Sequence, residues 1–192
     1  MKLFIFDVGN VVYSNTSVAP KIAKYLGITL EEFLKLAKSS GLDLLQKGLI
    51  SVEDFWSNFS KLFGKSISED LWAKFFDPLP IDGTIELIKK LRKHFRVVAG
   101  TNTILSHYEI HLKKGHYDIF DAVYASHVIH YTKPDPNFFM YILKSENAAP
   151  EETFFTDDDP KNVQCALALK INAFVFTDPK ELESKLKQLL GH

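Results

Sequence analysis

Two apolar stretches of this sequence end in aspartate. The first, LFIFD, ends at Asp7, and the second, TFFTDD, ends at the adjacent pair Asp157 and Asp158. A carboxylate at the end of a buried strand is costly unless it is paired or has a function. Carboxylate oxygens are ligands that Mg²⁺ prefers, and an aspartate can also act as a covalent nucleophile. These aspartates are therefore the first candidates for a reactive site.

Other polar residues follow apolar segments in the middle of the chain. The segment FRVVAGTN ends in Thr101 and Asn102, and the segment AVYASH contains Ser126 near its end. In open parallel sheets, ligands bind outside the carboxyl ends of the strands. If all these segments are strands of one such sheet, their polar ends meet at one edge. This convergence is the main sequence-based argument for an active site.

Strand-like and helix-like segments alternate along most of the chain. Short apolar runs that predict strands occupy residues 2–7, 95–102, 122–127, 153–159 and 173–178. Helical patterns lie between and after them at residues 83–93, 103–113, 135–147, 160–169 and 179–190. Such alternation is typical of a parallel sheet with right-handed crossover connections. The predicted fold is a doubly wound α/β sheet.

The region from 16 to 80 interrupts this alternation, because it shows only helical periodicity. Within it, Ser51, which is followed by Asp54, and Ser68 are the expected helix N-caps. The segment DPLPIDG, with its two prolines and a glycine, is expected to lead the chain back to the sheet. We therefore predict a core domain of residues 1–15 and 81–192, with a helical cap domain of residues 16–80 inserted after the first strand.

The composition is that of an ordinary globular protein. The chain has 192 residues and a formal net charge of −1, which gives no global field for nucleic acid or an anionic membrane. Its one cysteine, Cys165, allows no internal disulfide, and no apolar run approaches the roughly 20 residues of a membrane span. We expect a cytoplasmic monomer or homodimer that binds neither nucleic acid nor a membrane.

Four short motifs occur in order between residues 3 and 166. They are FDVGNVV, AGTNT, the pair Lys133-Pro134, and FTDDDPKNVQCA. Each motif alone has low specificity, but the ordered set at predicted strand ends is specific. The sequence resembles the haloacid dehalogenase-like (HAD-like) hydrolase superfamily, in particular the phosphatase subgroup with a D-x-G-N-V first motif, which includes sugar-1-phosphate phosphatases. The resemblance covers nearly the whole chain and implies a Rossmann-like core with a small helical cap.

The resemblance implies a role for each acidic motif residue. Asp7 corresponds to the nucleophile that attacks phosphorus and forms an aspartyl-phosphate. The implied ligands of a Mg²⁺ cofactor are Asp7, the backbone carbonyl of Gly9, Asp157 and Asp158. The implied partner is a small-molecule phosphate ester as substrate.

The resemblance also implies roles for Thr101, Asn102 and Lys133. The Thr101 hydroxyl and the backbone N–H of Asn102 would bind the transferring phosphoryl group. Lys133 would offset the charge of the carboxylates and hold Asp7 ionised and in place. By this resemblance, Thr101 and Lys133 join Asp7 as the catalytic residues.

Gly9 departs from the pattern of most phosphatases in this superfamily. These proteins carry a second aspartate there, which protonates the leaving group and is worth about 10²–10⁴-fold in rate. Three interpretations are open: a phosphatase that works without this acid, a metal-independent haloacid dehalogenase, and a catalytically weak phosphate-binding protein. We predict the first, a Mg²⁺-dependent phosphatase for a small phosphorylated metabolite, with sugar phosphates among the candidates.

Four histidines complete the titratable candidates. His107 and His111 are four residues apart on a predicted helix, which is a spacing found in metal sites. Because no third ligand is evident, we expect this pair to lie on a solvated helix face. His127 and His130 precede Lys133 and could contact substrate, but the sequence leaves their role open.

Overall fold

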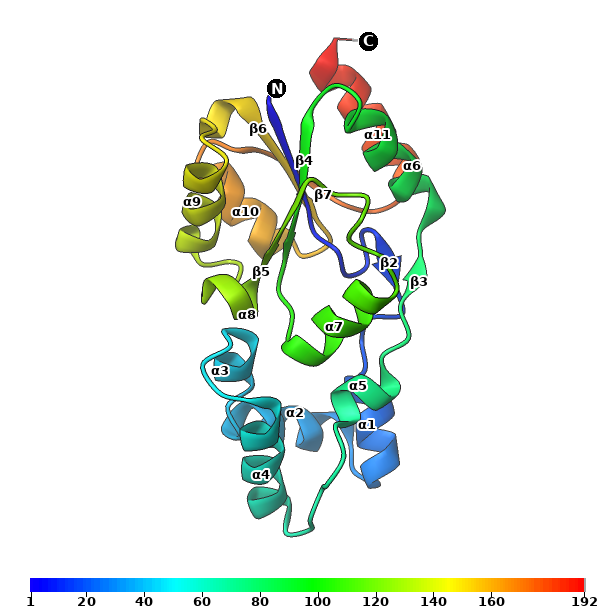
Figure 1. The fold of residues 1–192 in the computed structure, drawn as a ribbon, viewed down its shortest axis with the longest axis vertical. Helices are drawn as coiled ribbons and strands as arrows, with labels where there is room; N and C mark the ends of the chain where they lie inside the picture. Colours follow the sequence, from blue (N-terminus) through cyan, green and yellow to red (C-terminus); the bar gives the residue numbers. More distant parts are fainter. Residues whose placement is uncertain (192) are drawn as a thin grey trace.

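A five-stranded parallel sheet forms the centre of the computed structural model, which describes residues 1–191 (Figure 1). Its strands are β1 (Leu3–Phe6), β4 (Arg96–Thr101), β5 (Ala122–Ala125), β6 (Thr153–Asp157) and β7 (Asn172–Val175). The strand order is β5-β4-β1-β6-β7, so β1, which leads to Asp7, is the central strand. This topology confirms the predicted doubly wound α/β fold.

Helices cover both faces of the sheet. They are α6 (Asp82–Leu91) and α11 (Pro179–Leu190) on one face, and α9 (Pro136–Ser145) and α10 (Pro160–Ala168) on the other. Successive side chains of a strand point to opposite faces. Accordingly, Phe4 and Phe6 of β1 pack with the first pair of helices, whereas Leu3 and Ile5 pack with the second pair. A strand covered on both faces is apolar at every position, which explains the run that precedes Asp7.

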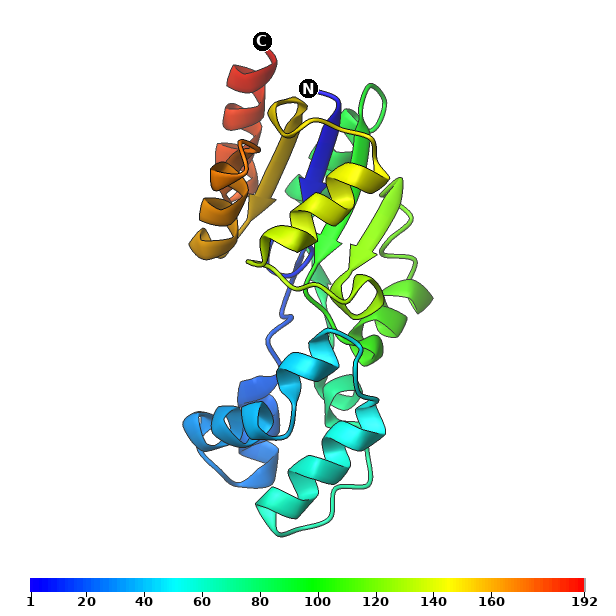
Figure 2. The same ribbon diagram turned by 90° about the vertical axis from the view of Figure 1, so that its left-hand side faces the viewer.

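Five helices of the segment between β1 and β4 lie together beyond the carboxyl ends of the strands (Figure 2). They are α1 (Ala19–Leu26), α2 (Leu30–Ser39), α3 (Leu42–Gln46), α4 (Val52–Phe63) and α5 (Leu71–Phe75). Their interior is a separate cluster of buried side chains that includes Phe33, Phe55 and Trp72. The helical content agrees with the predicted cap, and its status as a separate domain stays a prediction. Within residues 1–191, no helix is both long and apolar enough to cross a membrane.

The N-terminal ends of two cap helices test the predicted N-cap residues. Ser51 caps α4 as predicted: its hydroxyl accepts a hydrogen bond from the Asp54 N–H at 3.0 Å, and the Asp54 carboxylate accepts one from the Ser51 N–H at 3.1 Å. The prediction for Ser68 was wrong. The next helix, α5, begins after Asp70, whose carboxylate accepts from the Trp72 N–H at 2.9 Å and from the Trp56 indole at 3.1 Å. Asp70 is the better cap because its carboxylate also serves a buried indole.

Two short helices were not predicted. They are α3 and α8 (Ser126–Ile129), which follows β5 directly. Helices of this length contain about one turn, so they show no repeated 3.6-residue pattern. Both lie where the cap meets the core, with α3 directly opposite α8 (Figure 1).

The chain passes from the sheet to the cap helices and back once, and these two connecting segments run side by side. β2 (Tyr13–Ser14) and β3 (Leu79–Pro80) form an antiparallel ribbon in which Tyr13 pairs with Pro80 and Ser14 with Leu79. The Asn15 side-chain amide adds a hydrogen bond to the Asp77 carbonyl at 2.7 Å. The chain therefore leaves the core and returns to it at one place. The predicted return segment at 77–83 contains β3.

Candidate active site

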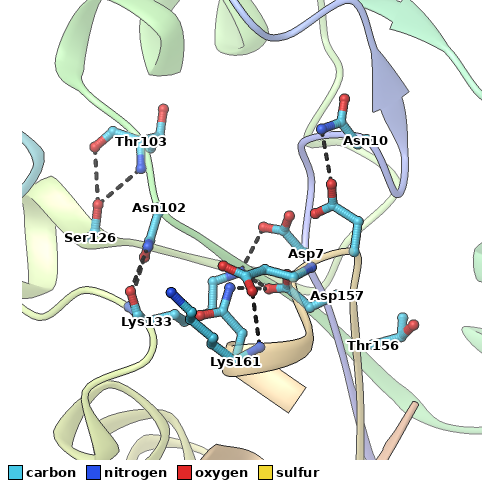
Figure 3. A network of polar contacts seen from close by, with 12 residues as sticks. Asp7, Asn10, Asn102, Thr103, Ser126, Lys133, Thr156, Asp157 and Lys161 are labelled. Carbon is cyan, nitrogen blue, oxygen red and sulfur yellow. Dashed lines mark hydrogen bonds and ion pairs between the residues drawn. The ribbon is translucent and has the colours of Figure 1, made fainter. Parts of the chain in front are cut away.

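Asp7, Lys133 and Asp157 form a buried ion network at the carboxyl ends of β1 and β6 (Figure 3). The Lys133 Nζ donates to Asp7 Oδ1 at 2.7 Å and to Asp157 Oδ2 at 2.6 Å. Lys133 lies in the loop between α8 and α9, and only 5% of its surface is exposed. A buried charge is tolerated when it is paired and hydrogen-bonded. Here one ammonium group bridges two carboxylates that would otherwise repel each other.

Burial has opposite effects on the acid and the base of this network. Burial raises the pKa of Asp7 to about 7, with the Asp157 carboxylate adding to the rise and the Lys133 ammonium opposing it. Burial alone would lower the pKa of Lys133, but the Asp7 and Asp157 carboxylates raise it above its ordinary value. The two carboxylates thus share one ammonium group, and the network lacks one positive charge when both acids are ionised.

Asp158 extends this pair into a cluster of three carboxylates. One oxygen from each of Asp7, Asp157 and Asp158 lies within 4.8 Å of the others. Asp158 is exposed, and its carboxylate accepts a hydrogen bond from the Asn10 side chain at 3.0 Å. Hard oxygen ligands with an open, solvent-facing side suit Mg²⁺. The donor set present here therefore fits that ion.

Asp157 is the most constrained acid of the cluster. Its Oδ1 accepts from the Asp159 N–H at 2.8 Å, and its Oδ2 accepts from the Asn162 amide at 3.0 Å as well as from Lys133. With both oxygens already bonded, Asp157 is best suited to hold Lys133 and to contribute charge. Asp158 and Asp7 have the freer oxygens.

Thr101 and Asn102 lie at the end of β4, next to the network. The Asn102 side chain pairs with the backbone of Lys133: its amide donates to the Lys133 carbonyl at 2.9 Å, and its oxygen accepts from the Lys133 N–H at 2.8 Å. This pairing fixes the loop that delivers Lys133, so the Asn102 side chain positions the lysine. Thr101 is 4% exposed and lines the pocket described below.

Gly9 lies close to the Asp7 side chain. Its φ angle is not in the left-handed region, so residues other than glycine can adopt the same backbone conformation. A Cβ atom built on Gly9 would lie 4.0 Å from Asp7 Oδ2 and 3.3 Å from the Thr16 hydroxyl. The Thr16 hydroxyl itself donates to the Asn10 side-chain oxygen at 3.2 Å. The position therefore has room for a small polar side chain, and a threonine hydroxyl borders that space.

A pocket of about 250 Å³ separates the strand ends from the cap helices. Gly9, Thr101 and Asn102 line it on the core side, and Trp72 and Phe76 line it on the cap side. It is therefore bounded by both parts of the molecule, and Val8 and Gly9, the two residues that follow Asp7, lie in its wall.

His107 and His111, on α7 (Leu105–Lys113), line this pocket, so the expectation of a solvated helix face was wrong. His111 is 3% exposed, and His107 stacks on Phe76 with ring centroids 3.9 Å apart. Burial lowers the pKa of His107 to about 4 and that of His111 to about 3, and the nearby His116 contributes to the shift of His111. This face of α7 is buried because the cap packs against it. The sequence of α7 alone does not show that contact.

The remaining two histidines and Ser126 lie at the junction of α8 with the cap. The Ser126 hydroxyl donates to the Gln46 carbonyl at 2.7 Å, and His130 Nδ1 lies 2.7 Å from the Lys47 carbonyl. His127 is half-buried and packs against the ring of Tyr108, with 4.9 Å between the ring centroids. These residues hold the cap against the core, and none of the three lines the pocket beside Asp7.

A family model described as haloacid dehalogenase-like hydrolase matches residues 1–169 of the sequence. The chain is a HAD-like hydrolase. The match spans the whole acid cluster, the Thr101–Asn102 pair and Lys133, so the family assignment covers every element of the site.

Two relatives of this HAD-like hydrolase that match over most of their length carry phosphatase names. Sesquiterpene phosphatase astK of Aspergillus oryzae is 26% identical over 196 residues, covering 99% of this chain and 97% of that protein. D-ribitol-5-phosphate phosphatase of Bacteroides thetaiotaomicron is 24% identical over 188 residues, covering 91% of each chain. A HAD family enzyme of the same bacterium, crystallised with magnesium and inorganic phosphate, has a TM-score of 0.76 and 25% identity, covering 93% of this chain and 95% of that one.

Proposed function

We propose that this HAD-like hydrolase is a Mg²⁺-dependent phosphatase that acts on a small phosphorylated metabolite through an aspartyl-phosphate intermediate. The observation that carries the proposal is the buried network in which Lys133 bridges Asp7 and Asp157 beside the exposed Asp158. The phosphatase names of the relatives, and the magnesium and phosphate bound by the Bacteroides enzyme, support it. A haloacid dehalogenase would have no use for this acid cluster.

Asp7 would act as the nucleophile. Lys133 holds Oδ1 at 2.7 Å, which fixes the carboxylate, while Oδ2 lies on the side of Gly9. Attack of Oδ2 on phosphorus breaks the bond between phosphorus and the ester oxygen, and the leaving group takes a proton from solvent. Water then attacks phosphorus, the bond to Asp7 breaks, and inorganic phosphate leaves. After the second step, Asp7 is again a free carboxylate.

The residues that would hold Mg²⁺ are Asp7, the backbone carbonyl of Gly9, Asp157 and Asp158. A bound Mg²⁺ supplies positive charge that offsets the phosphoryl group and the carboxylates. The Thr101 hydroxyl and the Asn102 N–H would bind phosphoryl oxygens at the end of β4, and Lys133 would add a positive charge beside them. Asn102 would also orient Lys133 through its side chain.

The glycine at position 9 restricts which esters are cleaved well. With no carboxylic acid there, leaving groups that need little protonation, such as the anomeric oxygen of a sugar 1-phosphate or a phenolate, would depart fastest. Thr16 borders the space but has no acidity near neutral pH. We therefore expect aryl esters to be better substrates than simple alkyl esters.

Hydrolysis of p-nitrophenyl phosphate tests the proposal. Purified protein should release p-nitrophenolate with Mg²⁺ and lose this activity with EDTA. Asp7→Asn should reduce kcat by about 10³-fold or more, because the nucleophile is lost. Asp178→Asn, which changes the N-cap of the distant α11, is the matched control. Release of chloride from 2-chloropropionate without metal, and no phosphate release, would instead show a dehalogenase.

A further inference from the structure

The C-terminal end of the cap helix α3 is capped by side chains of the core. The last carbonyl groups of a helix have no partner within the helix, and those of Gln46 and Lys47 accept no backbone N–H among the described residues. The Ser126 hydroxyl donates to the Gln46 carbonyl at 2.7 Å, and His130 Nδ1 lies 2.7 Å from the Lys47 carbonyl. Two side chains at the ends of α8 therefore complete the hydrogen bonding of a cap helix.

Gly48 brings the two backbones into contact beside these hydrogen bonds. A Cβ atom built on Gly48 would lie 2.1 Å from the carbonyl oxygen of His127, far inside van der Waals contact. The φ angle of Gly48, +64°, is also one that residues with a Cβ atom rarely adopt. The cap can approach α8 this closely because residue 48 is a glycine. We call this contact, formed by residues 46–48 and residues 126–130, the cap clasp.

Ser126 also bonds the segment that follows β4 (Figure 3). Its hydroxyl accepts from the Thr103 N–H at 2.9 Å and lies 3.0 Å from the Thr103 carbonyl oxygen. Ser126 is fully buried, so bulk water does not replace these partners. Thr103 follows Thr101 and Asn102, the residues that would bind the phosphoryl group. One hydroxyl group therefore contacts both the cap and the segment proposed to bind phosphate.

The Ser126 hydroxyl carries one proton but lies beside two carbonyl acceptors. The Gln46 carbonyl of the cap is the nearer one, at 2.7 Å against 3.0 Å for the Thr103 carbonyl. With the cap clasp formed, the proton is donated to Gln46, and the hydroxyl oxygen accepts the Thr103 N–H. Loss of the clasp would turn the proton toward the Thr103 carbonyl. The position of the cap therefore changes the hydrogen bonding of the residue after Asn102.

The second bond of the cap clasp leads to Lys133. His130 precedes Lys133 by three residues in the chain, and the Asn102 side chain bonds the Lys133 backbone at 2.8 Å and 2.9 Å. The two bonds of the clasp thus reach the two sides of one pairing, Asn102 through Ser126 and Thr103, and Lys133 through His130. A cap seated at the clasp therefore supports both segments that would bind phosphoryl oxygens.

We propose that Ser126 is a positioning residue through which the cap clasp strengthens phosphoryl binding at the end of β4. When residues 46–48 contact α8, the Ser126 hydroxyl holds Thr103 by its N–H and so fixes the Asn102 N–H one residue earlier. The inference rests on the proposed phosphatase function, which places the phosphoryl group there. By linkage, the clasp and a bound phosphoryl group stabilise each other to the same extent, and such couplings typically change affinity by about 5- to 150-fold.

A matched pair of glycine variants tests the cap clasp from the cap side. Gly48→Ala places a methyl group against the His127 carbonyl, whereas Gly64→Ala, at the end of α4 with φ of +76°, meets nothing within 4 Å. Both variants strain the backbone, but only the first displaces the cap from α8. We expect the Kd for inorganic phosphate, measured by calorimetry with saturating Mg²⁺, to rise about 5- to 20-fold in Gly48→Ala alone. Equal phosphate affinity in the two variants would overturn the proposal.

Ser126→Ala tests the same contact from the core side, without adding volume. We expect its Kd for inorganic phosphate to rise about 5- to 20-fold as well. Its Kd for Mg²⁺ alone should not change, because no residue of the cap clasp bonds a carboxylate of the acid cluster within the described residues. The control is Ser40→Ala, at a buried serine of the cap whose hydroxyl bonds the Leu36 carbonyl at 2.7 Å. A lower Tm with unchanged phosphate affinity in Ser126→Ala would show a merely structural role.

The double variant Gly48→Ala with Ser126→Ala tests whether the two changes act through one contact. Because each single variant already breaks the cap clasp, the double variant should bind phosphate no more weakly than the weaker of the two. Additive losses of affinity would show two unrelated effects and overturn the coupling.

The wild-type protein distinguishes this inference from the proposed function. If it binds phosphate and hydrolyses p-nitrophenyl phosphate, but Gly48→Ala and Ser126→Ala bind phosphate equally well, this inference fails alone. If the wild-type protein neither binds phosphate nor hydrolyses the ester with Mg²⁺, the proposed function fails, and this inference fails with it.

Discussion

The two sides of the candidate active site bury titratable groups in opposite ways. On the sheet side, the Lys133 ammonium group bonds Asp7 and Asp157 at 2.6–2.7 Å and opposes the rise that burial causes in the pKa of Asp7. On the side of the pocket that faces the cap, His107 and His111 of α7 form no ion pair with the described residues, and burial lowers their pKa well below neutral. Burial thus disfavours the charged form on both sides, and a directly bonded counter-charge opposes this effect in the Asp7–Lys133–Asp157 network.

The difference follows from the elements that supply each side. The charged side is built from loops at the carboxyl ends of parallel strands, where backbone N–H groups and polar side chains converge. The Asp159 N–H and the Asn162 amide, for example, both bond Asp157. The neutral side is built from α5, α7 and adjacent segments, whose backbone groups are mostly used within the helices. Helix packing supplies aromatic surface but few free donors or acceptors.

The largest expected effect comes from breaking the charged side. Lys133→Met should lower the free energy of unfolding by about 3–5 kcal/mol, because two buried carboxylates lose their partner. It should also lower kcat by about 10²–10³-fold through the lost positive charge. Chemical denaturation and phosphate release measure the two effects. Lys144→Met, at an exposed position on α9, is the control.

A double variant separates stability from catalysis on the same side. Lys133→Met combined with Asp157→Asn removes one of the two unpaired carboxylates, so part of the lost stability should return. Activity should stay low, because the ammonium group is still absent. A double variant no more stable than Lys133→Met would contradict the role of Lys133 as a bridge between two acids.

The second prediction introduces an acid at the boundary between the two sides. Gly9→Asp should raise kcat for glycerol 3-phosphate by about tenfold and for phenyl phosphate by less, since alkoxides need protonation more than phenolates do. The new Cβ would approach the Thr16 hydroxyl at 3.3 Å, which a small side-chain movement relieves. Gly9→Asn has the same size and no acidic proton. An equal gain in Gly9→Asn would exclude proton transfer as the cause.

The smallest expected effect is a pH dependence of stability on the neutral side. Burial lowers the pKa of His111 from 6.5 to about 3, so the unfolded chain binds a proton that the folded chain rejects. Stability from this residue is therefore complete above pH 6.5 and is lost as pH falls toward 3, by up to about 1.4 kcal/mol per pH unit.

Urea unfolding at pH 7 and pH 5 measures this slope. His111→Phe should flatten the difference between the two pH values, and the surface variant His94→Gln controls for the loss of a histidine. Phenylalanine suits a site already packed with Tyr13, Phe76 and Tyr117. An unchanged slope in His111→Phe would mean that His111 is not buried as a neutral group.

The sequence allowed prediction of the fold and of the residues on the charged side. Apolar runs bounded by turns predicted all five strands of the sheet, and their polar ends pointed to Asp7, Thr101 and Asp157. Both properties are local, so a single sequence displays them. The roles of these residues stay proposals, but the structure brings them together at one edge of the sheet, with Lys133 between the acids.

The neutral side could not be predicted, because it depends on packing between distant segments. Trp72 and Tyr117 meet in one pocket only after the cap folds over α7. The burial of His107 and His111 has the same origin, which is why their spacing alone indicated a solvated face. The Asn102 pairing with the Lys133 backbone is also non-local, and no periodicity signals a side-chain amide bonded to a loop 31 residues away.

The ribbon of β2 and β3 has a consequence for the modularity of the chain. Because Tyr13 pairs with Pro80, the two chain segments that connect the sheet to the helices α1–α5 lie side by side. Segments whose ends lie close together can be lengthened, shortened or exchanged at little entropic cost to the remainder. We therefore predict that a different helical insert, joined to the chain at Ser14 and Leu79, would leave the strand end that carries Asp7 in place and would change the residues that line the pocket.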